Sequence, residues 1–133
     1  MIDQNELYEE VYEARKLSYS PYSKFKVGAV IKLKNGKYIK GANIENSSYP
    51  LSMCAERCAI YSAYAQGYTI DDFEAFAIIG DTQNPISPCG ACRQVMSELL
   101  PRDINIYLFN LKHEVKIITI DELLPYAFDG EDL

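Results

Sequence analysis

The chain has 133 residues and a mass of 15.1 kDa, a size that one domain with its own hydrophobic core accounts for. Apolar residues make up 48% and charged residues 24%, which is the balance of a globular protein rather than a disordered one. The formal net charge of -6 disfavours nucleic-acid partners, because a negative surface repels phosphate chains.

The sequence gives no indication of a membrane or secretory destination. No apolar run approaches the roughly 20 residues that cross a bilayer, and the start of the chain is too polar for a secretory leader. Four cysteines in such a chain point to a reducing compartment rather than a disulfide framework. We therefore expect a cytoplasmic protein.

The first third of the chain predicts a helix followed by a β-hairpin. Apolar side chains recur at helical spacing over residues 4–18, until Ser20-Pro21 ends the pattern. Residues 25–33 are rich in β-branched side chains, and residues 38–42 form a second short run. Asn35-Gly36 lies between them and predicts a hairpin with a type I′ turn.

The rest of the chain alternates helices with strands after a loop over residues 43–53. Thr119 and Glu122 have capping-box spacing for a short last helix. This order favours an α/β fold around one mixed sheet, in a single domain over residues 1–133 with a mobile acidic tail over 129–133. The expected elements are helices at 54–66 and 88–100 and strands at 73–80, 104–110 and 114–118.

Three of the four cysteines open predicted helices. Cys54 begins the helix expected at 54–66, and Cys89 and Cys92 form a C-x-x-C motif at the start of the helix expected at 88–100. Helix N-termini favour thiolate over thiol, and three thiolates suit zinc. Three protein ligands leave a fourth position open, which is the mark of a catalytic zinc site.

Other uses of these cysteines remain open on the residues alone. A C-x-x-C motif also serves as a redox pair, although that use expects a thioredoxin-like context after a first strand. A structural zinc site requires a fourth ligand, for which the chain offers Cys58 or His113. The simpler interpretation makes Cys58 a small buried residue one helical turn after Cys54.

Two segments of the chain resemble the zinc signature of the cytidine deaminases, in particular the small homotetrameric type. They are Cys54-Ala55-Glu56-Arg57 and Pro88-Cys89-Gly90-Ala91-Cys92-Arg93-Gln94. The similarity extends to residues 20–29 and 41–46 and to Leu123-Leu124-Pro125 with Phe128. The resemblance implies a three-layer α/β/α sandwich around one mixed five-stranded sheet, a homotetramer, and one Zn²⁺ per subunit held by Cys54, Cys89 and Cys92.

The resemblance also implies a role for each site residue. Zinc would acidify water so that hydroxide adds to C4 of cytosine, with Glu56 as the proton shuttle. Arg57, otherwise a solvated helix residue, would donate hydrogen bonds to ligand sulfurs and offset their negative charge. The implied substrate residues are Asn43 and Glu45 for the ribose 3′-hydroxyl, Phe25 (otherwise a core residue) beside the base, the backbone of Ala55 and Ser87 for the base, and Phe128 in a neighbouring subunit's site.

The expected function is hydrolytic deamination of cytidine and deoxycytidine to uridine and deoxyuridine, with release of ammonia, in pyrimidine salvage. One alternative is a deaminase of another cytosine nucleoside, such as a nucleoside antibiotic. A nucleic-acid-editing deaminase is disfavoured by Cys54, where that class commonly has histidine, and by the negative charge. A non-catalytic zinc-stabilised binding domain would have no use for Glu56 beside an open ligand position.

Overall fold

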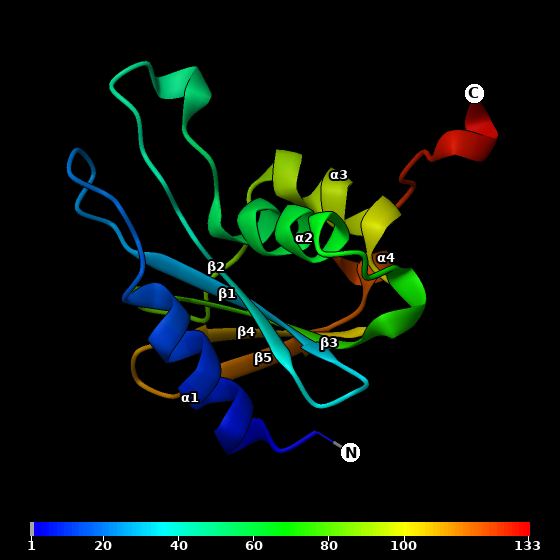
Figure 1. The fold of residues 1–133 in the computed structure, drawn as a ribbon, viewed down its shortest axis with the longest axis horizontal. Coiled ribbons are helices and arrows are strands. Elements are labelled where there is room, and N and C mark those ends of the chain that lie inside the picture. Colours follow the sequence, from blue (N-terminus) through cyan, green and yellow to red (C-terminus); the bar gives the residue numbers. More distant parts are fainter. Residues whose placement is uncertain (1) are drawn as a thin grey trace.

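The computed structural model describes residues 2–133, which form one five-stranded sheet with helices on both faces (Figure 1). In the sheet the strands lie in the order β2-β1-β3-β4-β5. The β3–β4 pair is parallel and the other three pairs are antiparallel, so the sheet is mixed. The strands are β1 (Val27–Leu33), β2 (Tyr38–Ala42), β3 (Phe73–Gly80), β4 (Asn105–Asn110) and β5 (Val115–Ile118).

The helices divide between the two faces of the sheet. Helix α1 (Gln4–Arg15) covers one face, and α2 (Ala55–Ala65) and α3 (Gly90–Leu99) lie over the other, with the short α4 (Ile120–Leu123) against α3 (Figure 1). Successive strand residues face opposite sides, so Ile31 of β1 joins the core under α2 and Val30 joins the core under α1. The predicted three-layer α/β/α sandwich is confirmed.

The predicted elements are confirmed in type; the strands over residues 38–42 and 73–80 have the predicted bounds, and the other elements differ at one or both ends. Helix α1 ends at Arg15 rather than at residue 18, because the chain turns there and Tyr19 N donates to Asn43 O at 2.9 Å. Strand β1 begins at Val27 rather than at residue 25, because the Phe25 carbonyl accepts a hydrogen bond from the Asn43 side chain at 2.7 Å. Hydrogen bonds with Asn43, from its backbone in the first case and its side chain in the second, therefore accompany both of these ends.

The β1–β2 hairpin forms as predicted, but the predicted type I′ turn is wrong. That turn requires positive φ at both central residues, whereas only Gly36, at φ 90°, has it; Asn35 does not. Gly36 N donates to Leu33 O at 2.9 Å, and Leu33 N donates to Lys37 O at 2.8 Å. The glycine thus closes a longer loop, in which Asn35 Oδ1 accepts from Lys37 N.

Two segments extend away from the body of the fold (Figure 1). The expected loop over residues 43–53 is pinned at its base by a bridge between Ile44 and Met53 and carries a 3₁₀ turn, Tyr49–Leu51. The chain after α4 ends in another 3₁₀ turn, Gly130–Asp132. Mobility of residues 129–133 remains a prediction. Among residues 2–133, no helix has both the length and the apolar character needed to cross a bilayer.

Candidate active site

Two helices begin next to each other at the cysteines. Cys54 is the N-cap of α2, Cys89 is the N-cap of α3, and Cys92 lies in the first turn of α3. The Cys92 amide donates to Cys89 Sγ at 3.5 Å, so a sulfur caps one of the free N–H groups of α3. Both helix N-termini therefore direct partial positive charge at the sulfurs.

The three sulfurs are spaced for a metal ion. They lie within 4.8 Å of one another, and Cys54 Sγ is 4.0 Å from Cys89 Sγ. Tetrahedral zinc with Zn–S bonds of about 2.3 Å separates its sulfurs by roughly 3.8 Å. Cys92 is buried, Cys54 half-buried and Cys89 exposed, which leaves one side of the cluster accessible. The residues present therefore fit one zinc ion with an open ligand position.

The surroundings of Cys54 favour its thiolate. A hydrogen bond from Cys92 lowers the pKa of Cys54, and the Arg57 guanidinium lowers it further, with Nη2 at 3.5 Å from the sulfur. The same sulfur–sulfur hydrogen bond, together with burial, raises the pKa of Cys92. The thiolate is the form of cysteine that binds metal. The surroundings of Cys54 therefore favour loss of its proton and binding of a metal ion.

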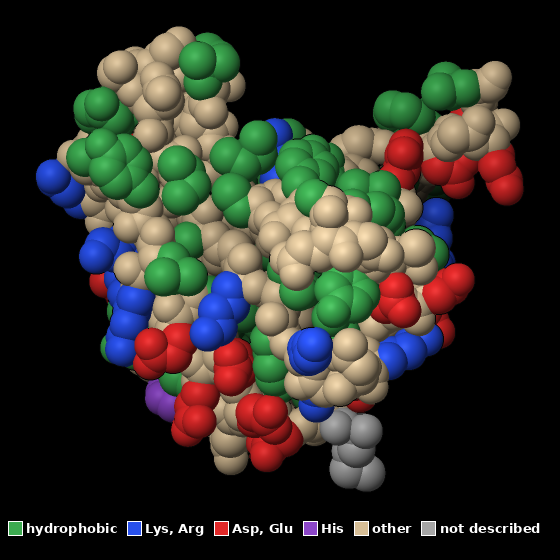
Figure 2. All heavy atoms as spheres, viewed as in Figure 1, with side chains coloured by type: hydrophobic (Ala, Val, Ile, Leu, Met, Phe, Trp, Pro, Cys, Tyr) green, Lys and Arg blue, Asp and Glu red, His purple; other side chains and the backbone are tan. Residues whose placement is uncertain are grey.

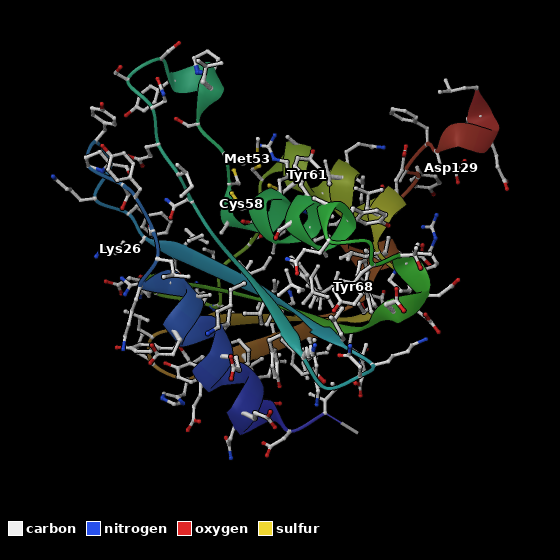
Figure 3. All side chains as sticks on the ribbon, viewed as in Figure 1. Lys26, Met53, Cys58, Tyr61, Tyr68 and Asp129 are labelled. Carbon is white, nitrogen blue, oxygen red and sulfur yellow. The ribbon has the colours of Figure 1, made fainter. Side chains whose placement is uncertain are left out.

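Neither residue proposed as a fourth protein ligand joins the cluster that residues 2–133 contain. Cys58 is half-buried on α2 (Figure 3), and burial raises the pKa of its thiol. His113 lies over the opposite face of the sheet, where its ring stacks on Tyr8 of α1 at 3.8 Å between centroids. The geometry therefore disfavours a closed structural zinc site.

Glu56 is a buried carboxyl group next to the cluster. It is the second residue of α2 and only 5% exposed. Burial is the main cause that raises its pKa, and the nearby Cys54 charge adds to this effect. A carboxyl group with a raised pKa in a cavity is suited to accept and return a proton near neutral pH.

A cavity of about 260 Å³ opens beside Cys54, Cys89 and Glu56. Its wall brings together segments far apart in the sequence, from the start of β1, the end of β2, the start of α2 and the loop before α3. The cavity is lined by Ser23, Phe25, Val27, Asn43, Glu45, Cys54, Ala55, Glu56, Ile86, Ser87 and Cys89. Five of the six predicted substrate residues are therefore at one cavity.

Asn43 is held rigidly at the edge of this cavity. Its Oδ1 accepts hydrogen bonds from Val27 N at 3.0 Å and from the Ser18 hydroxyl, while its Nδ2 donates to Phe25 O at 2.7 Å. These contacts also place Phe25, which is 38% exposed and lines the cavity instead of joining the core.

Glu45 is held by the turn that precedes β1. Its Oε1 accepts from Tyr22 N at 3.0 Å and Ser23 N at 3.1 Å, and its Oε2 accepts from the Ser23 hydroxyl. The Ser23 hydroxyl is the main cause that lowers the pKa of Glu45. The carboxylate is therefore ionised and oriented as a hydrogen-bond acceptor at the cavity.

Phe128 does not join the other predicted substrate residues. It is 56% exposed, and its carbonyl accepts a hydrogen bond from Gln94 Nε2 at 3.2 Å. The segment that carries it, next to the labelled Asp129, projects away from the sheet (Figure 3). Within a single chain, Phe128 lies outside the cavity formed by residues 2–133.

Sequence analysis did not single out several residues that shape the site. Ser18 and Ser23 orient Asn43 and Glu45, and Ile86 contributes an apolar wall. Arg93, four residues after Cys89, holds the loop before α3 through two hydrogen bonds and donates a third to Leu123 O of α4. Both serines flank the Ser20-Pro21 pair, but only the fold brings that segment to the end of β2.

The comparisons with known proteins agree with this geometry. Residues 1–108 match the family model described as the cytidine and deoxycytidylate deaminase zinc-binding region. The chain is 50% identical over 132 residues to a cytidine deaminase of Halalkalibacterium halodurans, covering 99% of this chain and 98% of that protein. It is 45% identical over 132 residues to one of Sporosarcina psychrophila, covering 99% and 96%.

A solved structure shares both the fold and the sequence pattern. The crystal structure of cytidine deaminase from Burkholderia pseudomallei superposes with a TM-score of 0.92 at 46% identity, covering 96% of this chain and all of that one. The fold and the three-cysteine cluster define a zinc-binding deaminase domain. The chain belongs to the cytidine and deoxycytidylate deaminase family.

Proposed function

We propose that this protein is a zinc-dependent cytidine deaminase that converts cytidine and deoxycytidine to uridine and deoxyuridine with release of ammonia. One observation carries the proposal. A buried glutamate, Glu56, and an open three-cysteine cluster share a cavity whose edge presents Asn43 and Glu45. The identities of about half with cytidine deaminases over nearly the whole chain support the same reaction.

Cys54, Cys89 and Cys92 would hold the zinc. When bound there, zinc supplies a Lewis acid that brings the pKa of water close to neutrality. Arg57 donates a hydrogen bond to Cys54 Sγ, and the N-termini of α2 and α3 add partial positive charge. These groups draw electron density from three thiolates, whose combined charge would otherwise weaken the metal as an acid.

Glu56 moves the protons. Its buried carboxylate takes a proton from the attacking water and returns it to N3 of the cytosine ring. It then takes the remaining proton from the hydroxyl group added at C4 and delivers it to the amino group, so that the C4–N bond breaks, ammonia leaves and the C4 carbonyl forms. Burial raises the pKa of Glu56, which favours its holding a proton between the two transfers.

Asn43 and Glu45 hold the sugar. The Glu45 carboxylate accepts from the Ser23 hydroxyl and keeps lone pairs for a ribose hydroxyl. Its ionised state makes a phosphate at this end of the cavity unfavourable, so the substrate is a free nucleoside. Phe25 packs beside the base, and the backbone groups of Ala55 and Ser87 bond to its polar edge.

The proposal includes a cytoplasmic homotetramer in which Phe128 reaches a neighbouring subunit's cavity. The face that carries α2, α3 and the loop over residues 43–53 presents apolar side chains and few charges, whereas the opposite end carries most of the charged ones (Figure 2). Tyr49 and Leu51 of that loop are 64% and 70% exposed. Apolar groups so exposed in one chain favour burial between subunits.

The deciding experiment follows the loss of cytidine absorbance on mixing with the zinc-loaded protein. We expect turnover of cytidine and deoxycytidine and none of cytidine 5′-monophosphate. Turnover confined to a modified cytosine nucleoside would favour the alternative substrate. No turnover of any cytosine nucleoside by protein with one zinc per chain would contradict the proposed function and favour a non-catalytic zinc domain.

A further inference from the structure

The loop that enters α3 is held by Arg93. This loop, residues 85–88, joins the cavity to the Cys89 sulfur. Arg93 Nε donates to Pro88 O at 2.9 Å, and its Nη2 donates to Ser87 Oγ at 2.5 Å. The Nη1 donates to Leu123 O, at the end of α4, at 3.0 Å. One guanidinium therefore ties this loop to the C-terminal part of the fold.

Ile86 and Pro88 of this loop are buried, and Ile86 N donates to Phe109 O at 3.3 Å, whereas the exposed Ser87 is held through its hydroxyl by Arg93. Pro88 has no N–H to donate, so its carbonyl is the only backbone hydrogen-bonding group it offers, and Arg93 occupies it. On the far side of Ser87 lies a second cavity of about 300 Å³, which Ser87 lines together with Arg93 and Leu123. Ser87 thus borders both cavities, and its exposed side chain lies between the buried Ile86 and Pro88.

The dipole of α3 does not stabilise the positive charge of Arg93. Arg93 follows the first turn of α3, where the helix dipole favours negative rather than positive charge. Its three hydrogen-bond partners are instead a carbonyl, a hydroxyl and a second carbonyl, which the planar fork of a guanidinium can reach together. A lysine ammonium carries its three donors on one nitrogen and cannot span all three acceptors.

We infer that Arg93 is a positioning residue for the nucleoside base: through Pro88 and Ser87 it fixes the cavity wall that the base contacts. This inference rests on the proposed function, because the Ser87 backbone contact to the base belongs to it. Arg93 touches neither the sulfurs nor the cavity. Its hydrogen bond to Ser87 Oγ keeps Ser87 from shifting into the second cavity.

The test compares four zinc-loaded variants with the zinc-loaded wild type: Arg93→Ala, Arg93→Lys, Ser87→Ala and Arg102→Ala. The control, Arg102→Ala, also removes a guanidinium bound to α4, since Arg102 Nη1 lies 2.8 Å from Asp121 Oδ1 on the surface. The readouts are zinc per chain, kcat and KM for cytidine, the Kd of uridine by calorimetry, and Tm.

We expect Arg93→Ala to raise the KM of cytidine and the Kd of uridine about 10-fold or more, the range seen when supporting partners of a metal site are removed. Arg93→Lys should resemble Arg93→Ala, and Ser87→Ala, which loses one bond of three, should show a smaller rise. Arg102→Ala should stay within about twofold of the wild type in both constants.

The outcomes separate this inference from the proposed function. A wild type that neither turns over cytidine nor binds uridine contradicts the proposed function and the inference with it. An active wild type whose Arg93 variants lose Tm but keep KM and the uridine Kd within about twofold contradicts the inference alone, because Arg93 would then only stabilise the fold. If Arg93→Ala does not fold, unchanged constants in both Arg93→Lys and Ser87→Ala overturn it.

Discussion

At the scale of single residues, Glu56 combines two properties that rarely occur together in a surface helix. It is nearly buried, and it follows directly after a cysteine of the metal cluster. Burial raises its pKa, which favours the protonated carboxyl group. Burial also makes the charged carboxylate costly. Its position at a cavity lowers this cost, because the carboxyl group is not enclosed by the apolar core.

Replacing Glu56 with glutamine should abolish turnover and preserve the metal site. Glutamine keeps the size and polarity of the side chain but cannot carry a proton, so we expect kcat for cytidine to fall about 10³-fold or more. Zinc per chain and Tm should stay near the wild-type values. Steady-state kinetics with metal analysis check this, and a near-normal kcat would remove Glu56 from the mechanism.

Arg57 is a cation in the first turn of α2, where the helix dipole opposes it. Its contact with Cys54 Sγ compensates for that position. We expect Arg57→Ala to retain part of its zinc and to lose about 10- to 100-fold in kcat/KM, because the thiolates then donate more charge to the metal. Measuring zinc content beside activity separates this effect from simple metal loss; full activity with normal zinc would contradict charge compensation.

At the scale of elements, two glycines set how closely helices approach the sheet. A Cβ on Gly41 of β2 would lie 2.4 Å from Ala59 N of α2, and a Cβ on Gly28 of β1 would lie 2.4 Å from Arg15 N of α1. Both contacts are to backbone, so an added methyl group displaces the helix. Cys54 and Glu56 belong to α2 and its N-cap. A displacement of α2 therefore moves residues of the site, whereas a displacement of α1 does not.

The matched substitutions Gly41→Ala and Gly28→Ala test this difference. Each should lower the free energy of unfolding by about 1–3 kcal/mol, the usual effect of overpacking. Gly41→Ala should in addition weaken zinc retention and cytidine turnover, whereas Gly28→Ala should leave kcat of the folded fraction unchanged. Urea denaturation with zinc analysis and kinetics distinguishes the two; equal losses of activity would show that α2 does not position the site.

At the scale of the whole molecule, a single chain leaves apolar side chains exposed to solvent, Phe128 among them. Phe128 projects outward, and Tyr49 and Leu51 are largely exposed. Burial of such groups between subunits contributes roughly 25 cal/mol per Å². In the proposed tetramer, association of subunits would also place Phe128 within reach of a neighbouring subunit's cavity.

We expect the protein to sediment at about 60 kDa, four times the chain mass of 15.1 kDa. Leu51→Asp should reduce that mass, because a carboxylate is costly to bury in an apolar interface. Phe128→Ala should leave the mass unchanged and raise the KM of cytidine. Analytical ultracentrifugation with kinetics checks each part, and a 15 kDa species with full activity would contradict the tetramer.

Much of this protein could be read from local sequence. Apolar spacing, residue composition and capping-box spacing placed every helix and strand to within a few residues, since these are local properties of the chain. Cys54 and the C-x-x-C at Cys89 indicated zinc, because thiolate ligands at two helix starts are a local chemical pattern. The hairpin was also predictable, although its turn type was not, because loop length and strand register select it.

Only the tertiary structure decided which residues meet. Sheet order brings the turn at Ser23 to Glu45, and the pairing of β1 with β2 brings Phe25 to Asn43. These contacts join residues some 20 positions apart, and helical or strand periodicity carries no information at that distance. The sequence determined the chemistry that the site contains, while packing of α2 and α3 on one face of the sheet decided the cavity in which that chemistry operates.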